Sequence, residues 1–212
     1  MNRTTGEHRP VILAMTGASG AAYGLRLLDC LVRAERPVYF LLSKAAQIVL
    51  AMETDLDIPS KPVQMQDWLR KQYAARPGQI QVLGRDQWTA PVASGSHNAE
   101  HMVVCPCTTG SLAAIANGNS DNLIERAADV MIKERRELIM VVRETPLSSI
   151  HLENMLKLSR IGVTIMPANP GFYHKPASID DMVDFIVARI LDHLQVPHTL
   201  VDRWGLGDET FF

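Results

Sequence analysis

Short apolar segments alternate with amphipathic ones along this chain, and that alternation limits the fold more than any other feature. The apolar segments have the length of buried strands, and the segments between them place leucine and valine at helical spacing, as at Leu25, Leu28 and Val32. Strands that alternate with helices are joined by right-handed crossovers and form a parallel sheet covered on both faces. We therefore predict an α/β fold, a three-layer Rossmann-like (flavodoxin-like) single domain with a mainly parallel sheet.

The expected elements follow from this periodicity. Strands are predicted over 11–16, 38–42, 80–83, 102–105, 138–142 and 163–166, with Pro106 ending the fourth. Helices are predicted over 22–35, 44–53, 65–74, 111–116, 122–135, 149–161 and 179–194. A loop rich in small residues is expected over 90–96.

Length and charge narrow the class of protein further. A chain of 212 residues suits one compact domain, which we place at 10–205, between a disordered N-terminal tail (1–9) and a C-terminal tail (206–212). The formal net charge of -2 lacks the basic excess of a nucleic-acid-binding protein. The apolar runs are far shorter than the roughly 20 residues that cross a bilayer, and the polar start is unlike a signal peptide. We expect a cytoplasmic protein that binds neither nucleic acid nor a membrane.

Three cysteines, Cys30, Cys105 and Cys107, are present. The Cys-Pro-Cys pair lacks both the two-residue gap and the second pair of a structural zinc site. We therefore predict buried free thiols and no bound metal.

The residues that follow the predicted strands carry the chemical information, because ligands of open parallel sheets bind at the carboxyl ends of the strands. Thr16-Gly17-Ala18-Ser19-Gly20 follows the first strand, and its glycines allow a tight turn into a helix whose free N–H groups favour an anion. The spacing is neither a full G-x-G-x-x-G nor a Walker motif. Alone, this turn fits a phosphate or cofactor loop and a purely structural turn about equally.

Hydroxyl residues follow two further strands. Ser43 comes after the second strand, and Thr108, Thr109, Gly110 and Ser111 form the turn that opens the helix after Pro106. Hydroxyls at such positions are most often helix N-caps. A single phosphorylated cofactor lying across the sheet would, however, contact all three turns.

Charged residues are expected at the same edge. Arg143 and Glu144 directly follow the fifth strand, where they form either a surface ion pair or part of a ligand site. Arg126 and Lys133 lie seven positions apart and share one helical face. With Arg143 they would form the cluster that a phosphate-bearing substrate needs.

Aromatic residues complete the candidate set. The proline-rich loop after the sixth strand carries Phe172 and Tyr173; Phe172 fits a core role equally well, whereas the Tyr173 hydroxyl suits a polar ligand contact. Arg189 lies on the last helix and Trp204 in the tail.

Five segments together resemble the flavin prenyltransferases, the UbiX and Pad family, and the resemblance covers roughly residues 10–205. They are Met15-Thr16-Gly17-Ala18-Ser19-Gly20, Cys105-Pro106-Cys107-Thr108-Thr109-Gly110-Ser111, Asn122-Leu123-Ile124-Glu125-Arg126-Ala127-Ala128-Asp129-Val130, Ser148-Ser149-Ile150-His151-Leu152-Glu153-Asn154-Met155 and Pro170-Gly171-Phe172-Tyr173.

The resemblance implies a metal-independent transfer of a dimethylallyl group from dimethylallyl phosphate to N5 of reduced FMN, followed by ring closure at C6. The product, prenylated FMN, would serve a UbiD-type decarboxylase such as the one in ubiquinone synthesis. The family's assembly as homododecamers with sites at subunit contacts implies the same here.

The resemblance also implies a role for each matched residue. The residues that would hold FMN are Gly17, Ala18, Ser19, Ser43, Thr108, Thr109, Gly110, Ser111 and Arg143. Those that would bind the donor are Trp88, Ser94, Arg126, Lys133, Glu144, Tyr173, Arg189 and Trp204. The catalytic set would be Ser19 near N5, Glu53, Lys133 and Glu144, with Glu144 moving protons during ring closure.

Two alternatives remain open at this point. A flavin-dependent decarboxylase of the phosphopantothenoylcysteine type also begins with a glycine-rich turn, but its Pro-x-Met-Asn segment is replaced here by Ala90-Pro91-Val92-Ala93-Ser94-Gly95-Ser96. A non-catalytic FMN-binding protein would need the FMN loops but not Lys133, Glu144 and Arg189 together.

Overall fold

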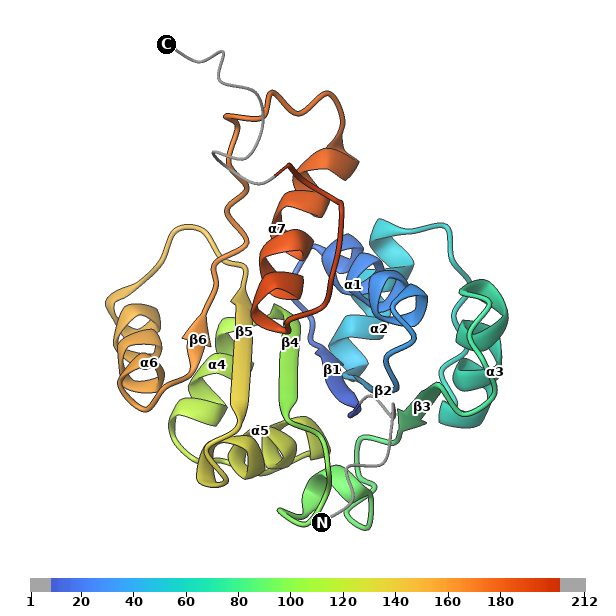
Figure 1. Ribbon diagram of the computed structural model, residues 1–212. Coiled ribbons are helices and arrows are strands. Elements are labelled where there is room, and N and C mark those ends of the chain that lie inside the picture. Colours follow the sequence, from blue (N-terminus) through green and yellow to red (C-terminus); the bar gives the residue numbers. More distant parts are fainter. Residues whose placement is uncertain (1–8, 203–212) are drawn as a thin grey trace, which may run out of the picture.

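The computed structural model describes residues 9–202, and a six-stranded sheet forms their centre (Figure 1). Every strand pairs in parallel with its neighbours, in the order β3-β2-β1-β4-β5-β6. The strands are β1 (Val11–Met15), β2 (Val38–Leu42), β3 (Ile80–Leu83), β4 (His101–Cys107), β5 (Glu137–Val142) and β6 (Thr164–Ile165).

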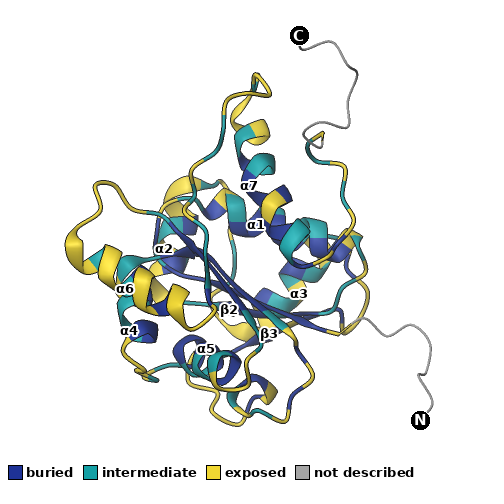
Figure 2. Cartoon of the chain, turned by 60° about the vertical axis from the view of Figure 1, so that its left-hand side comes forward, coloured by how far each residue is buried: buried dark blue, intermediate teal, exposed yellow. Residues whose placement is uncertain are grey.

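Helices cover both faces of the sheet, so the predicted three-layer Rossmann-like fold is confirmed (Figure 2). One face packs against α1 (Ala21–Arg33), α2 (Lys44–Glu53), α3 (Pro62–Gln72) and α7 (Ile179–His193). The other packs against the 3-10 helix η1 (Pro91–Ala93), α4 (Thr109–Ala116), α5 (Leu123–Lys133) and α6 (Ser149–Arg160). Strand residues alternate between these two apolar clusters, as expected for a parallel sheet buried on both sides.

The predicted elements agree closely with the structure, and β2, β3 and α2 have the predicted bounds. The fourth strand was predicted wrongly, because β4 continues through Pro106 to Cys107. Proline has no N–H to donate, and the ladder between β4 and β5 accordingly shifts register between Val104 and Cys107. The Pro106 carbonyl is still used, since it accepts a hydrogen bond from the Thr16 backbone N–H at 3.1 Å.

The chain order reverses between β1 and β4, which are neighbours in the sheet although β2 and β3 come between them in sequence. The chain segments that follow two such strands lead to opposite faces of the sheet, and a crevice opens between them at the carboxyl ends of the strands. The turns after β1 and β4 therefore flank the position where the fold favours a ligand.

Other predictions on overall organisation have mixed outcomes. Cys105 and Cys107 are buried free thiols, as predicted, and Cys30 is free but only partly buried. Among residues 9–202, no helix combines the length and apolar character needed to cross a membrane. The tails predicted at 1–9 and 206–212 lie almost entirely outside the described residues, and the domain limits stay a prediction.

Candidate active site

The turn after β1 holds an anion, but the anion comes from the chain itself. The carboxylate of Glu53, at the end of α2, accepts hydrogen bonds from the backbone N–H groups of Gly20 (2.9 Å) and Ala21 (2.8 Å) at the start of α1. The N-terminus of a helix favours negative charge, so this carboxylate is well placed. The anion at this turn is therefore the Glu53 carboxylate, and the N–H groups of Gly20 and Ala21 are already occupied.

Glu53 and Ser19, both predicted to be catalytic, are brought together by this arrangement. Burial acts to raise the pKa of Glu53, but hydrogen bonds from the Ser19 side chain, Ala21 and Gly20, together with the charge of Arg143, outweigh it. The pKa of Glu53 is therefore lower than its ordinary value. The side chain is ionised at neutral pH and joins the turn after β1 to the end of α2.

Glu53→Gln is expected to lower the free energy of unfolding by about 0.3–1 kcal/mol at neutral pH, since an amide carries no charge toward the helix terminus. A lowered folded pKa stabilises the protein fully above the ordinary pKa, and this stabilisation is lost as the pH falls through the folded value. The difference between wild type and variant should therefore vanish as the pH drops from about 5 to below 4.

Urea unfolding at a fixed protein concentration measures this difference. Asp67→Asn, which removes an exposed carboxylate from α3, is the matched control and should leave the pH dependence unchanged. A Glu53→Gln difference that is the same at every pH would contradict the ionised role.

Gly17 allows the tight turn that its position predicts, and packing within the chain also requires a residue without a side chain here. A Cβ atom built on Gly17 would collide with the Ala45 side chain at the start of α2. Ala18 beside it is buried, and Ser19 is exposed at the sheet edge. Gly17 thus allows α2 to pack against the turn, whereas Ser19 is the residue that faces outward.

Thr16 connects the two turns at the switch point, a role that the sequence did not reveal. Its hydroxyl donates to the Pro106 carbonyl at 2.9 Å and accepts from the backbone N–H of Thr108 at 2.8 Å. The side chain is buried, with 3% of its surface exposed. The ends of β1 and β4 are therefore held in a fixed relation.

The turn after β4 combines a capping role with free donors. Thr108 is the N-cap of α4, and its Oγ1 accepts from the backbone N–H of Ser111 at 3.0 Å. The N–H groups of Thr109 and Gly110, in the first turn of the helix, have no acceptor within residues 9–202. These two donors are available to an anion.

Gly110 leaves unused space at the same place. Among the described residues, a Cβ built on Gly110 would have only Thr108 Oγ1 within 4 Å, at 3.9 Å. The chain's own packing therefore does not require a glycine here, in contrast to Gly17. A group from outside the chain would be able to approach the backbone at this point.

Ser43 has the capping role that its position predicted. Its side chain accepts from the backbone N–H of Ala46 at 3.0 Å, and its own N–H donates to the Met15 carbonyl at 3.1 Å. Ser43 therefore lies beside the end of β1, on the same edge of the sheet as the other two turns.

Arg143 and Glu144 do not form an ion pair with each other in the described part of the chain. The Arg143 N–H donates to the Cys107 carbonyl at 3.2 Å, which places this residue next to the Thr108–Ser111 turn. Its Nε is buried and has no hydrogen-bond partner among the described residues. Glu144 Oε1 accepts from the Thr145 backbone N–H at 3.0 Å.

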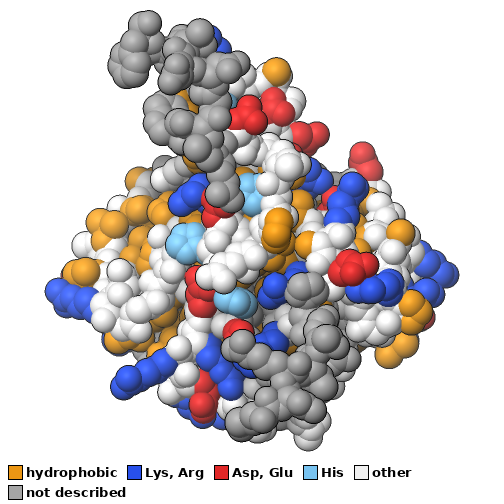
Figure 3. Space-filling model, in the orientation of Figure 1, with side chains coloured by type: hydrophobic (Ala, Val, Ile, Leu, Met, Phe, Trp, Pro, Cys, Tyr) orange, Lys and Arg blue, Asp and Glu red, His pale blue; other side chains and the backbone are white. Residues whose placement is uncertain are grey.

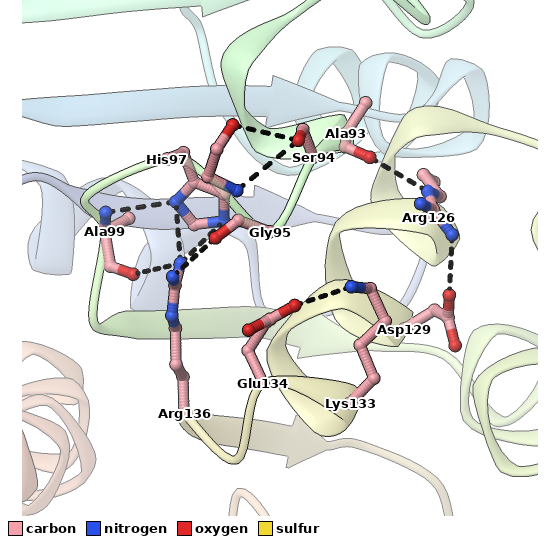
Figure 4. Close-up of polar contacts among 11 residues, drawn as sticks. Ala93, Ser94, Gly95, His97, Ala99, Arg126, Asp129, Lys133, Glu134 and Arg136 are labelled. Atoms are coloured by element: carbon pink, nitrogen blue, oxygen red, sulfur yellow. Dashed lines mark hydrogen bonds and ion pairs between the residues drawn. The ribbon is translucent and has the colours of Figure 1, made fainter.

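Arg126, Lys133 and Ser94 lie in a second group, gathered around residues 93–99 (Figure 4). Arg126 Nε donates to the Ala93 carbonyl at 3.0 Å, and Lys133 Nζ pairs with Glu134 at 2.6 Å.

Lys133 precedes β5 whereas Arg143 follows it, so the two residues lie near opposite ends of that strand. Six residues at about 3.3 Å each separate those ends by roughly 17–20 Å. Within one chain, the expected cluster of Arg126, Lys133 and Arg143 at one edge is therefore not formed.

Tyr173, in the loop before α7, and Arg189, on α7, form a third group. They line a cavity of about 440 Å³ together with His174, Phe185 and residues of the 198–202 segment. The Tyr173 ring lies edge-on to Phe185, with centroids 5.8 Å apart, and Arg189 pairs with Asp192 at 2.7 Å.

The two predicted tryptophans have different outcomes. Trp88 is half exposed, between β3 and η1. Trp204 lies outside the described residues.

The turns after β1, β2 and β4 together with Arg143, which we call the strand-end group, have the features of a site for a phosphorylated flavin. A buried Arg143 Nε without a partner, two free N–H groups at the start of α4 and open space at Gly110 adjoin one another at the switch point. These groups fit the phosphate and polar edge of FMN. Within residues 9–202 no group of three or more His, Cys, Asp or Glu side chains is arranged to hold a metal ion. Fold and site together define an α/β flavin-binding protein.

Comparisons with known proteins narrow this class. The family model described as Flavoprotein matches residues 1–191. The flavin prenyltransferase UbiX of Pseudomonas aeruginosa is 61% identical over 195 residues, which cover 92% of this chain and 93% of that protein. The chain belongs to the flavin prenyltransferase family of flavoproteins.

Solved structures agree with this assignment. AnUbiX (PadA1), in complex with FMN and dimethylallyl pyrophosphate, is 40% identical with a TM-score of 0.83, covering 95% of this chain and all of that one. A dodecameric FMN-dependent Ubix-like decarboxylase from Escherichia coli O157:H7 is 38% identical with a TM-score of 0.80, covering 92% and 98% of the two chains.

Proposed function

We propose that this protein joins the dimethylallyl group of dimethylallyl phosphate to N5 and C6 of reduced FMN. The observation that carries the proposal is the site at the switch point, where free N–H donors, the buried and unpartnered Nε of Arg143 and the Ser19–Glu53 pair lie at the carboxyl ends of the strands. The solved AnUbiX complex contains FMN and dimethylallyl pyrophosphate, which supports FMN and a phosphorylated dimethylallyl donor as the two substrates.

The proposed flavin contacts use the strand-end group. The turn at the start of α4 and Arg143 would bind the phosphate and polar atoms of FMN, and Ser19 would face N5. The full set is Gly17, Ala18, Ser19, Ser43, Thr108, Thr109, Gly110, Ser111 and Arg143.

The proposed reaction produces negative charge on the departing phosphate and positive charge on the allylic carbon, and the site must stabilise both. Breaking the allylic C–O bond leaves a phosphate, which Lys133, Tyr173 and Arg189 would stabilise, with Arg126 and Ser94 beside them. The allylic carbon bonds to N5, and the proton that N5 loses would pass to the departing phosphate. The carbon also needs an electron-rich neighbour, which Trp88 or Trp204 would provide. Ring closure moves one proton from C6 and adds one to the double bond, and Glu144 is the group proposed to move protons.

A complete site is proposed to form between subunits. Lys133 lies roughly a strand length from Arg143 in one chain, so a second copy would bring the two together. Exposed apolar side chains of α6, namely Ile150, Leu152 and Leu156, offer contact surface, and hydrophobic side chains gather on that side in Figure 3. The dodecamer of the related E. coli protein supports a homododecamer here.

Mass analysis of the flavin tests the proposal directly. Protein is incubated anaerobically with reduced FMN and dimethylallyl phosphate, or in a parallel sample the diphosphate, and the flavin is released and weighed. A flavin heavier by the dimethylallyl group is the expected result with at least one donor. Unchanged FMN with both donors would leave a non-catalytic FMN-binding protein as the better account.

We further propose that the product is passed to a UbiD-type decarboxylase in the cytoplasm. Prenylated FMN is useful only to an enzyme that takes it as a cofactor, and the three free cysteines fit a reducing compartment.

A further inference from the structure

Residues 94–99, which lie between η1 and β4, accept hydrogen bonds from one arginine elsewhere in the chain. Arg136 lies in the short connection between α5 and β5, and its two terminal nitrogens donate to the Gly95 carbonyl (2.7 Å) and the Ala99 carbonyl (3.1 Å) (Figure 4). A planar guanidinium with several donors is suited to joining two carbonyls in this way. Arg136 thus fixes both ends of this segment, which we call the 94–99 loop.

His97 adds a third point of attachment inside the same loop. Its ring is buried, with 8% of the residue surface exposed, and Nδ1 accepts from the Ala99 backbone N–H at 3.0 Å. Arg136 Nη1 lies 3.2 Å from each of the two ring nitrogens, so the guanidinium rests against the ring. The loop therefore folds around the Arg136 side chain.

The loop backbone also lies against Lys133. A Cβ atom built on Gly95 would collide with the Glu134 carboxylate and come within 3.1 Å of Lys133 Nζ. Glu134 in turn pairs with Lys133 at 2.6 Å. Any shift of the loop at Gly95 would therefore disturb the Lys133 ammonium and the neighbouring Ser94 together.

We propose that Arg136 is a positioning residue for the allylic phosphate. By holding the Gly95 and Ala99 carbonyls, it keeps Ser94 and Lys133 in one arrangement that binds the phosphate of the donor. Arg136 itself does not contact the substrates, and FMN binds on the strand-end group away from it. This inference rests on the proposed function, since it concerns the donor of that reaction.

The test separates loop position from catalysis with two readouts on the full-length protein. In Arg136→Ala, hydrogen exchange of amides in the 94–99 loop should become faster, while amides of β1 and β4 keep their wild-type rates. The KM for dimethylallyl phosphate should rise about tenfold, with kcat at saturating donor and the Kd for FMN within about twofold of wild type. Arg136→Lys, which keeps a donor but not the fork, should recover part of the loss.

Two further variants distinguish an effect of the 94–99 loop from a general loss of structure. Arg135→Ala removes the same charge from the adjacent, exposed position and should behave as wild type. Gly95→Ala leaves Arg136 intact but crowds Glu134, so it should raise the donor KM in the same way.

Each outcome bears on the inference separately from the reaction. Wild-type exchange in the 94–99 loop of Arg136→Ala would overturn it, whatever the turnover. Faster exchange with an unchanged donor KM would overturn the positioning role and leave only a structural one. If wild type forms no prenylated flavin, the proposed function fails. Calorimetric titration of dimethylallyl phosphate into wild type and Arg136→Ala then tests the positioning role of Arg136 by itself. Equal affinities of the two proteins would refute that role.

Discussion

Glu144→Gln is expected to reduce turnover roughly 10²-fold or more while FMN and the donor still bind, because an amide cannot take up or release the proton that ring closure requires. The substitution leaves the local structure intact for a specific reason. Glu144 Oε1 accepts the Thr145 backbone N–H, and the amide oxygen of glutamine can do the same. A loss of activity would then report on chemistry and not on folding.

Stopped-flow spectra with reduced FMN and dimethylallyl phosphate measure the two chemical steps separately. In Glu144→Gln the first alkylation should proceed and an N5-alkylated flavin should accumulate, since bond formation at N5 needs no proton from Glu144. Asp67→Asn, the same chemical change on an exposed helix position, serves as the control and should turn over normally. Wild-type rates in Glu144→Gln would remove this residue from the catalytic set.

Mixing two inactive variants is expected to restore activity, because the proposed site takes its two halves from different subunits. Arg143→Ala damages the flavin half and Lys133→Ala the donor half, and these residues lie near opposite ends of β5. Each variant alone should be nearly inactive. In randomly mixed assemblies, about a quarter of the sites should combine an intact flavin half with an intact donor half.

Co-expression of the two variants with different affinity tags, followed by tandem purification, provides the mixed assemblies. Lys133→Ala mixed with Arg126→Ala is the matched control, since both residues belong to the same half and no intact donor half can form. Light scattering checks that assemblies have the same size in every sample. Mixed assemblies of Lys133→Ala and Arg143→Ala that stay inactive would indicate that each site lies within one chain.

Local sequence patterns were sufficient for most of the fold. The bounds of β2, β3 and α2 could be predicted because hydrophobic periodicity and capping residues act over a few positions. The strand-end turns could also be predicted to meet, since parallel strands bring their carboxyl ends to one edge. In this way Ser19, Thr108 and Arg143 were assigned to one site from the sequence.

Contacts between distant positions required the tertiary structure. Thr16 and Pro106 are 90 positions apart, and no local pattern announces the buried hydroxyl that joins them. The same holds for the carboxylate of Glu53 at the start of α1, 32 positions from Ala21. A helix terminus attracts any anion, so the sequence could predict the negative charge but not which group supplies it.

The sequence by itself determined the layers of the fold, the family and the residue types at each strand end. The tertiary structure decided which of those residues share a site in one chain. Lys133 and Arg143 are only ten positions apart in sequence, yet β5 lies between them and runs from the amino end to the carboxyl end of the sheet. A strand is rigid and extended, so residues on either side of it in the same chain are separated by its full length.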